Sequence, residues 1–137
     1  MNQVRDAMNG PVIAVDPTTS AAEAARLMRD QDTGDVVIVE DGELTGIVTD
    51  RDLAVRLVAE GLDPNAPVSE VCTDSPITVA ADDSLQAAAD LMEQYSVRRL
   101  PVRDGDNVVG FISLGDLAQR MDASGTLTDI SASTPNW

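Results

Sequence analysis

Residues 46–54 read GIVTDRDLA, and residues 110–118, which lie 64 positions later, read GFISLGDLA. The same offset relates AARLM at 24–28 to AADLM at 88–92. An ungapped repeat of this length indicates two copies of one supersecondary unit, each too small to bury its own apolar face. We therefore expect the two copies to pack on each other and to carry a pair of equivalent sites.

Each copy predicts the order strand, helix, strand, strand, helix. In the first copy, the apolar run 12–15 predicts a strand, and Ser20 with Glu23 has the form of a capping box that opens a helix. Helical spacing places four small or flexible apolar residues on one face of this helix: Ala21, Ala24, Ala25 and Met28.

The rest of the first copy predicts a hairpin and a second helix. The β-branched run 36–39 is typical of a strand that is covered on both faces, and a turn at 40–43 leads into a strand at 44–48. We expect the second helices of the two copies to begin near Asp50 and Leu114.

The boundaries follow from helix stops and from where the repeat ends. We predict a first repeat at 4–61, a linker at 62–67, a second repeat at 68–122 and a C-terminal tail at 123–137, with Trp137 as a candidate docking residue. Within the second repeat, Pro101 predicts a strand end or an edge strand, because proline cannot donate to a β-ladder.

Composition limits the function classes. The net charge of −15 argues against nucleic acid and anionic membranes as general partners, since both require a basic patch. The chain has no histidine, which excludes a histidine-dependent triad or metal site, and its one cysteine, Cys72, is expected to be a small buried core residue. With no membrane span and no secretory signal pattern, we expect a cytoplasmic protein that is not an enzyme.

The repeated motif places a hydroxyl at the end of a strand and a carboxylate in the first turn of the next helix. A helix start offers unpaired N–H groups that suit a phosphate, and a neighbouring carboxylate can accept the hydroxyls of a ribose. The same pattern, Ser/Thr-x-x-Asp, also caps helices without any ligand. Both readings remain open from the residues alone.

The tandem βαββα units, the two Gly-x-x-Thr/Ser-x-x-Asp motifs and the stretch VRRLPV at 97–102 resemble a pair of CBS (cystathionine β-synthase) domains. The stretches 50–52 and 61–65 further resemble stand-alone actinobacterial CBS proteins of the hypoxic response protein type. The resemblance implies an α/β (α+β) fold, a tandem CBS-domain pair of two βαββα units with pseudo-two-fold symmetry. It also implies two clefts that hold AMP, ADP, ATP or S-adenosylmethionine.

In the family, each cleft combines the hydroxyl and aspartate of one unit with base-lining residues of the other. Carried over, the first cleft consists of Thr49, Arg51, Asp52, Ile77, Val97, Arg98 and Pro101. The second consists of Ser113, Asp116, Ile13, Thr33, Gly34 and Val37. Arginine suits phosphate, so the first cleft is expected to prefer an anion over the second, which has Asp35 and two glycines at the corresponding positions.

We therefore expect a non-enzymatic regulatory module that binds an adenosine-containing ligand, without catalytic residues, a resident cofactor or a metal. The expected partners are the nucleotide, a second copy in a homodimer and a regulated protein of unknown identity. The alternative is a stress-associated or protein-interaction CBS protein with vestigial clefts, whose motifs only cap helices.

Overall fold

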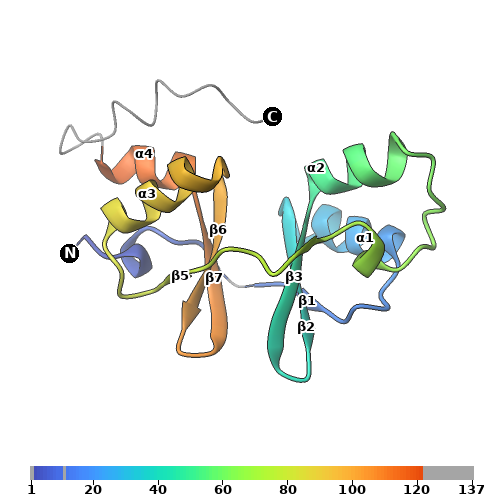
Figure 1. Cartoon of the computed structure of the whole chain (residues 1–137), viewed down its shortest axis with the longest axis horizontal. Coiled ribbons are helices and arrows are strands. Elements are labelled where there is room, and N and C mark those ends of the chain that lie inside the picture. Colours follow the sequence, from blue (N-terminus) through green and yellow to red (C-terminus); the bar gives the residue numbers. More distant parts are fainter. Residues whose placement is uncertain (1, 11, 122–137) are drawn as a thin grey trace. The chain divides into compact units, whose positions relative to one another are not determined.

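The computed structural model describes residues 2–10 and 12–121 (Figure 1). The chain forms two compact units. Residues 12–76 make up the repeat-1 unit, and residues 2–10 together with 77–121 make up the repeat-2 unit. Each unit has its own hydrophobic core. The predicted tail at 123–137, with Trp137, lies outside the described residues.

The repeat-1 unit has a four-stranded sheet with helices on one side (Figure 1). The sheet order is β1 (Ala14–Val15), β2 (Asp35–Glu40), β3 (Glu43–Thr49), β4 (Thr73–Asp74). β1 runs parallel to β2, and the other neighbours are antiparallel. The helical elements are α1 (Ala21–Gln31), α2 (Asp50–Asp52), the π-helical η2 (Leu53–Val58) and the 3-10 helix η3 (Val68–Glu70).

The repeat-2 unit repeats this order of elements. Its sheet runs β5 (Val79–Ala80), β6 (Arg99–Asp104), β7 (Asn107–Ser113). Its helical elements are the 3-10 helix η1 (Val4–Asp6), α3 (Leu85–Tyr95) and α4 (Leu114–Met121). The mixed α/β class and the strand, helix, strand, strand, helix order of each repeat are thus confirmed.

Serine side chains start the first helix of each unit. The Ser20 hydroxyl accepts a hydrogen bond from the Glu23 backbone N–H at 3.0 Å, and Ser84 caps α3 in the same way. The carboxylate of Glu23 pairs with Arg26 at 3.8 Å. The predicted N-cap is therefore confirmed at Ser20, while the structure assigns no reciprocal bond from Glu23 to complete a capping box.

The alanine-rich helix faces pack against the sheets. Ala24 and its counterpart Ala88 are both fully buried, as expected for equivalent positions in two copies of one unit. Ala25 is exposed although Ala89, its counterpart, is fully buried. The prediction that Ala25 belongs to the buried face of α1 is wrong. The buried face of α1 is narrower than that of α3, and it leaves Ala25 outside.

The short helix at the start of each repeat packs on the core of the other repeat. Val4 of η1 is fully buried in the repeat-2 core, and its N–H donates to the Asp83 carbonyl at 2.8 Å. Val68 of η3 is fully buried in the repeat-1 core, and its N–H donates to the Thr19 carbonyl at 2.8 Å. The two entry segments are therefore exchanged between the repeats.

Pro101 lies inside β6, the central strand of its sheet, opposite Phe111 of β7. The prediction of a strand end or an edge strand is wrong. Phe111 exchanges backbone hydrogen bonds of 2.8 and 2.9 Å with Asn9 on its other side. Pro101 and Phe111 are therefore a non-hydrogen-bonded antiparallel pair, at which the missing N–H of proline costs no β7 bond.

The missing N–H of Pro101 affects the pairing of β6 with β5 instead. In the repeat-1 unit, Val37, the counterpart of Pro101, donates its N–H to the Ile13 carbonyl at 2.9 Å, directly before β1 begins at Ala14. Pro101 cannot make the equivalent bond. This accounts for the start of β5 at Val79, one repeat position later than β1.

The motif glycines allow a close backbone approach. A Cβ atom on Gly110 would lie 2.6 Å from the Asn9 carbonyl oxygen and 3.1 Å from Met8 Sδ. A Cβ atom on Gly46 would lie 3.1 Å from Cys72 Sγ and 3.3 Å from the nearest backbone oxygen. The glycine of the motif is therefore required by packing, and more strictly in the second copy than in the first.

We expect Gly110→Ala to lower the free energy of unfolding by about 1–3 kcal/mol, because the backbone of Asn9 would have to move. Gly46→Ala is the matched control and should cost less, since its nearest neighbour is a side chain. Urea denaturation of both variants measures the difference. Equal losses would contradict the importance of the backbone contact.

Cys72 is a free, buried thiol in the repeat-1 core, as predicted. Its Sγ donates to Asp74 Oδ1 at 3.3 Å. Burial, followed by this neighbouring carboxylate, raises the pKa of the Cys72 thiol to about 11. At neutral pH the group is therefore a protonated thiol, which is a poor nucleophile.

We expect Cys72 to react with iodoacetamide at pH 8 at least ~100-fold more slowly in the folded protein than in urea, because both thiolate formation and access are suppressed. The chain has one cysteine, so mass spectrometry reads this site directly. Equal rates in the two states would show that the thiol is not held as described.

Candidate functional site

Thr49 and Asp52 form a reciprocal pair at the end of β3. The Thr49 N–H donates to Asp52 Oδ2 at 2.9 Å, and the Asp52 N–H donates to Thr49 Oγ1 at 3.1 Å. These two bonds make a capping box that starts α2. The local sequence therefore fixes both side chains where a strand ends and a helix begins.

Ser113 and Asp116 repeat this arrangement at the end of β7. The Ser113 N–H donates to Asp116 Oδ2 at 2.8 Å, and the Asp116 N–H donates to Ser113 Oγ at 3.1 Å. Helix capping, one of the two roles open from the sequence, is thus performed by both motifs. Each box uses the Oδ2 atom of its carboxylate and leaves Oδ1 outside the box.

The Oδ1 atom of Asp52 lies beside a cation. Arg56 Nε is 3.8 Å from Asp52 Oδ1, one helical turn further along the chain. Arg56 is itself fixed, because its Nη1 donates to the Cys72 carbonyl at 2.7 Å. The Asp52 side chain is only 13% exposed, so this positive neighbour is weakly screened.

The Oδ1 atom of Asp116 has a neutral partner instead. Asn9 Nδ2 donates to it at 2.9 Å, across 107 residues of sequence. Arg120, the counterpart of Arg56, donates to the Asp6 carbonyl. The two carboxylates therefore differ in local charge, although their capping boxes are the same.

In each unit, the loop before the first hairpin strand lies against the motif. The Asp50 N–H donates to the Gly34 carbonyl at 2.9 Å, and the Leu114 N–H donates to the Arg98 carbonyl at 2.8 Å. The Thr33 hydroxyl, in the first of these loops, donates to Asp35 Oδ1 at 3.2 Å. The predicted loop residues and motif residues of one unit are thus brought together.

The structure divides the predicted site residues between the units as follows. The repeat-1 unit contains Ile13, Thr33, Gly34, Val37, Thr49, Arg51 and Asp52. The repeat-2 unit contains Ile77, Val97, Arg98, Pro101, Ser113 and Asp116. Each predicted cleft draws on both lists, and the joining of the two halves stays a prediction.

Arg51, which was predicted for the first cleft, differs in its surroundings from the arginines of β6 and the residue before it. Arg51 is exposed on α2, and its counterpart in α4 is Gly115. Arg98 and Arg99 are half-buried at the start of β6. Arg103 is exposed, and its Nε donates to Thr78 Oγ1 at 3.2 Å.

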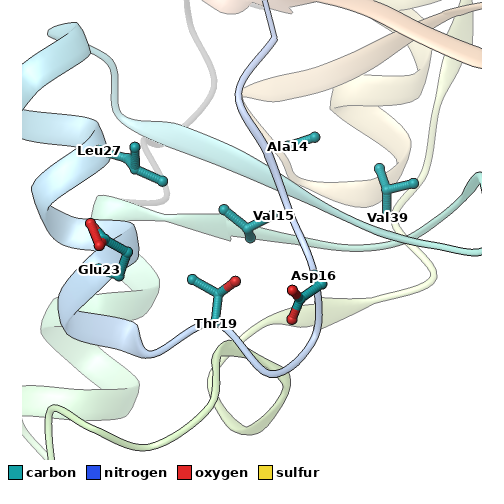
Figure 2. A pocket seen from close by; sticks show the side chains of 7 residues that line it. All are labelled: Ala14, Val15, Asp16, Thr19, Glu23, Leu27 and Val39. Carbon is teal, nitrogen blue, oxygen red and sulfur yellow. The ribbon is translucent and has the colours of Figure 1, made fainter.

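The repeat-1 unit has a hollow of about 570 Å³ between α1 and the strands β1 and β2. Figure 2 shows the side chains that line it. Its lining residues are Ala14, Val15, Asp16, Thr19, Glu23, Leu27 and Val39. None of them is a predicted site residue. Its charged groups are the carboxylates of Asp16 and Glu23, which disfavour a phosphate. We therefore place the candidate site at the motifs and not in this hollow.

Residues 2–10 and 12–121 contain neither a metal-binding cluster nor a membrane-spanning helix. No group of three or more Cys, Asp or Glu side chains there is arranged to hold a metal ion. No helix in this part of the chain is long and apolar enough to cross a membrane.

Sequence reasoning missed two residues at the motifs. Arg56 could have been found, because it follows Asp52 by four residues on a helix, a spacing at which opposite charges pair. Asn9 gave no local signal, since its partner Asp116 is distant in sequence and its own repeat counterpart is Thr73.

The family model described as "CBS domain" matches the chain twice, at residues 4–59 and 68–123. CBS domain-containing protein YhcV of Bacillus subtilis (strain 168) is 42% identical over 135 residues, which cover 96% of this chain and 96% of that protein. Hypoxic response protein 1 of Mycobacterium tuberculosis (strain ATCC 25618 / H37Rv) is 37% identical over 123 residues, covering 88% of this chain and 86% of that protein.

Solved structures agree with these matches. Hypoxic Response Protein I with two coordinated zinc ions has a TM-score of 0.74 at 36% identity, covering 85% of this chain and 97% of that one. The CBS domain pair of protein MJ0100, in complex with 5′-methylthioadenosine and S-adenosyl-L-methionine, has a TM-score of 0.79 at 26% identity, covering 90% and 98%. CBSX2 in complex with AMP has a TM-score of 0.71 at 26% identity, covering 90% and 98%.

The family model covers both repeats, and relatives of similar length align with nearly the whole chain. The resemblance drawn from the repeated motif is therefore confirmed: the chain belongs to the CBS domain family and carries two CBS domains in tandem.

Proposed function

We propose that this protein is a non-enzymatic regulatory module that binds an adenosine-containing ligand at its Thr49–Asp52 and Ser113–Asp116 motifs. One observation carries the proposal. Each motif holds a hydroxyl and a carboxylate in fixed register at a strand end, and each capping box leaves the Oδ1 atom of its carboxylate outside. A fixed carboxylate with free acceptor positions suits the two hydroxyls of a ribose.

The charges around the first motif support a phosphate on the ligand. Arg51 is exposed one residue before Asp52, and Arg56 lies 3.8 Å from the Asp52 carboxylate. Guanidinium groups bind phosphate through paired, charge-assisted hydrogen bonds. In the proposal, Arg98 of the other unit adds to this charge, and Ile77, Val97 and Pro101 line the base.

The ligand class is supported by the structural relatives. MJ0100 was solved with 5′-methylthioadenosine and S-adenosyl-L-methionine, and CBSX2 with AMP. We propose AMP, ADP, ATP or S-adenosylmethionine for this chain. The zinc ions of Hypoxic Response Protein I are not carried over, because this chain has no histidine and its described residues hold no metal-binding cluster.

The proposed mechanism is differential binding in the cytoplasm. A ligand that binds one arrangement of the two repeats better than another shifts the population toward that arrangement. A protein partner that recognises only this arrangement then responds to the ligand concentration, with a coupling that acts equally in both directions.

The alternative is a protein-interaction or stress-associated role with vestigial clefts. One observation favours it: the capping boxes are complete in both repeats, so helix initiation alone accounts for the hydroxyl and the carboxylate. A ligand titration separates the two functions, because only the first requires binding.

We also propose a homodimer. Three large apolar side chains are exposed on η2 and the turn after it: Val55 at 47%, Val58 at 73% and Leu62 at 40%. All three lie between positions 55 and 62, on η2 and in the turn that follows it. Contiguous exposed apolar surface of this kind is typical of protein–protein contacts, and symmetric dimers are the commonest soluble assembly.

For ligand binding, we expect Asp52→Ala to weaken AMP affinity at least ~10-fold, because a charge-assisted hydrogen bond contributes about 1.5–3 kcal/mol. Asp116→Ala should weaken it no more than about threefold, since no arginine lies at position 115 beside that carboxylate. Calorimetric titration with AMP measures both affinities.

Asp50→Ala is the matched control for this titration, because it removes the same charge from the same helical turn and leaves the capping box intact. It should bind AMP like the unmodified chain. A larger loss of AMP affinity for Asp116→Ala than for Asp52→Ala would show that AMP prefers the Ser113–Asp116 site. No heat with any adenosine compound would favour the alternative with vestigial clefts.

For the dimer, we expect Val58→Asp to dissociate it, because a carboxylate would be desolvated at the contact. Tyr95→Asp is the matched control, since Tyr95 is also an exposed large side chain, at 46%, on a different element. Analytical ultracentrifugation at micromolar concentration should show a monomer for Val58→Asp alone. A monomeric unmodified chain would contradict the proposal.

A further inference from the structure

Asn9 is held firmly against the strand that carries the second motif. Its backbone exchanges two hydrogen bonds with Phe111, at 2.8 and 2.9 Å. Its carbonyl lies so close to Gly110 that a Cβ atom there would be 2.6 Å away. The segment that carries Asn9 lies at the start of the first repeat in sequence and yet belongs to the repeat-2 unit.

The Asn9 side chain completes the fixation of Asp116. The Ser113 N–H fixes Oδ2 of Asp116 at 2.8 Å, and Asn9 Nδ2 fixes Oδ1 at 2.9 Å. A carboxylate has about four acceptor positions, two on each oxygen. Two remain on Asp116, one on each oxygen, and a ribose presents two neighbouring hydroxyl donors.

The other motif lacks this second constraint. Thr73 occupies the position of Asn9 in the repeat-1 unit, and its backbone pairs with Ile47 as Asn9 pairs with Phe111. Oδ1 of Asp52 faces Arg56 at 3.8 Å, which is longer than a hydrogen bond. Asp52 therefore has a positive neighbour and a looser orientation, whereas Asp116 has a fixed orientation and a neutral neighbour.

We propose that Asn9 is a positioning residue that orients the Asp116 carboxylate for the ribose hydroxyls and makes the Ser113–Asp116 site selective for adenosine compounds without phosphate. This rests on the proposed function, and it assigns the two motifs different ligands. Pre-orientation of an acceptor raises affinity because less freedom is lost on binding. A neutral amide orients Asp116 and leaves its negative charge in place, which disfavours a phosphate nearby.

The test uses the full-length chain with Asp52→Ala, so that binding reports the Ser113–Asp116 site. The probes are adenosine, 2′-deoxyadenosine and AMP, titrated by calorimetry. Adding Asn9→Ala should weaken adenosine binding about tenfold and change 2′-deoxyadenosine binding little, so that the preference for ribose is lost. Before that change, adenosine should bind more tightly than AMP.

Thr73→Ala in the same Asp52→Ala chain is the matched control and should leave all three affinities unchanged. A purely structural role of Asn9 would lower the melting temperature and weaken both nucleosides equally, or neither; each of these results overturns the proposal. Tighter binding of AMP than of adenosine overturns the phosphate-free selectivity.

Failure of the proposed function gives a different result. In that case the unmodified chain binds none of the three probes, and both proposals fall together. If the unmodified chain binds and Asn9→Ala keeps the preference for ribose, the positioning role of Asn9 alone is wrong.

Discussion

The close approach of two backbones at Gly110 is the contact on which the second motif depends. It allows Asn9 to pair with Phe111, and this pairing extends the sheet and places the Asn9 amide beside Asp116. The first repeat uses the same construction, with β4 against β3 at Gly46. The glycine of the motif is therefore a packing residue, and in the second repeat it lets the Asn9 amide reach the Asp116 carboxylate.

The hydroxyl and the carboxylate of each motif have a structural role that does not require a ligand. Their capping boxes satisfy N–H groups at a helix start, which folding requires whether or not a ligand is present. The motif alone therefore identifies a helix start. In the proposed function, the groups around the second carboxylate oxygen distinguish the two sites.

The sequence was sufficient for the order of elements, because hydrophobic periodicity and the repeat both report local structure. The sequence was insufficient where the position of a residue in a sheet depends on distant neighbouring strands. Pro101 lies in a central strand because its partner Phe111 bonds to Asn9, and this pairing is invisible in the local sequence. The motif residues were predictable from their spacing. Arg56 was predictable too, because it follows Asp52 by four residues on a helix. Asn9 was not, since its contact with Asp116 spans 107 residues.

The exchange of entry segments also sets an order of events during synthesis. Residues 12–76 are continuous, so the repeat-1 unit has all of its chain as soon as position 76 is made. The repeat-2 unit needs residues 2–10 from the beginning of the chain and the helix that ends at Met121. Its closure joins distant segments, which is slow compared with local pairing. Val4 and Met8 both pack in the apolar interior of this unit. Their native contacts therefore cannot form until the second repeat has been translated.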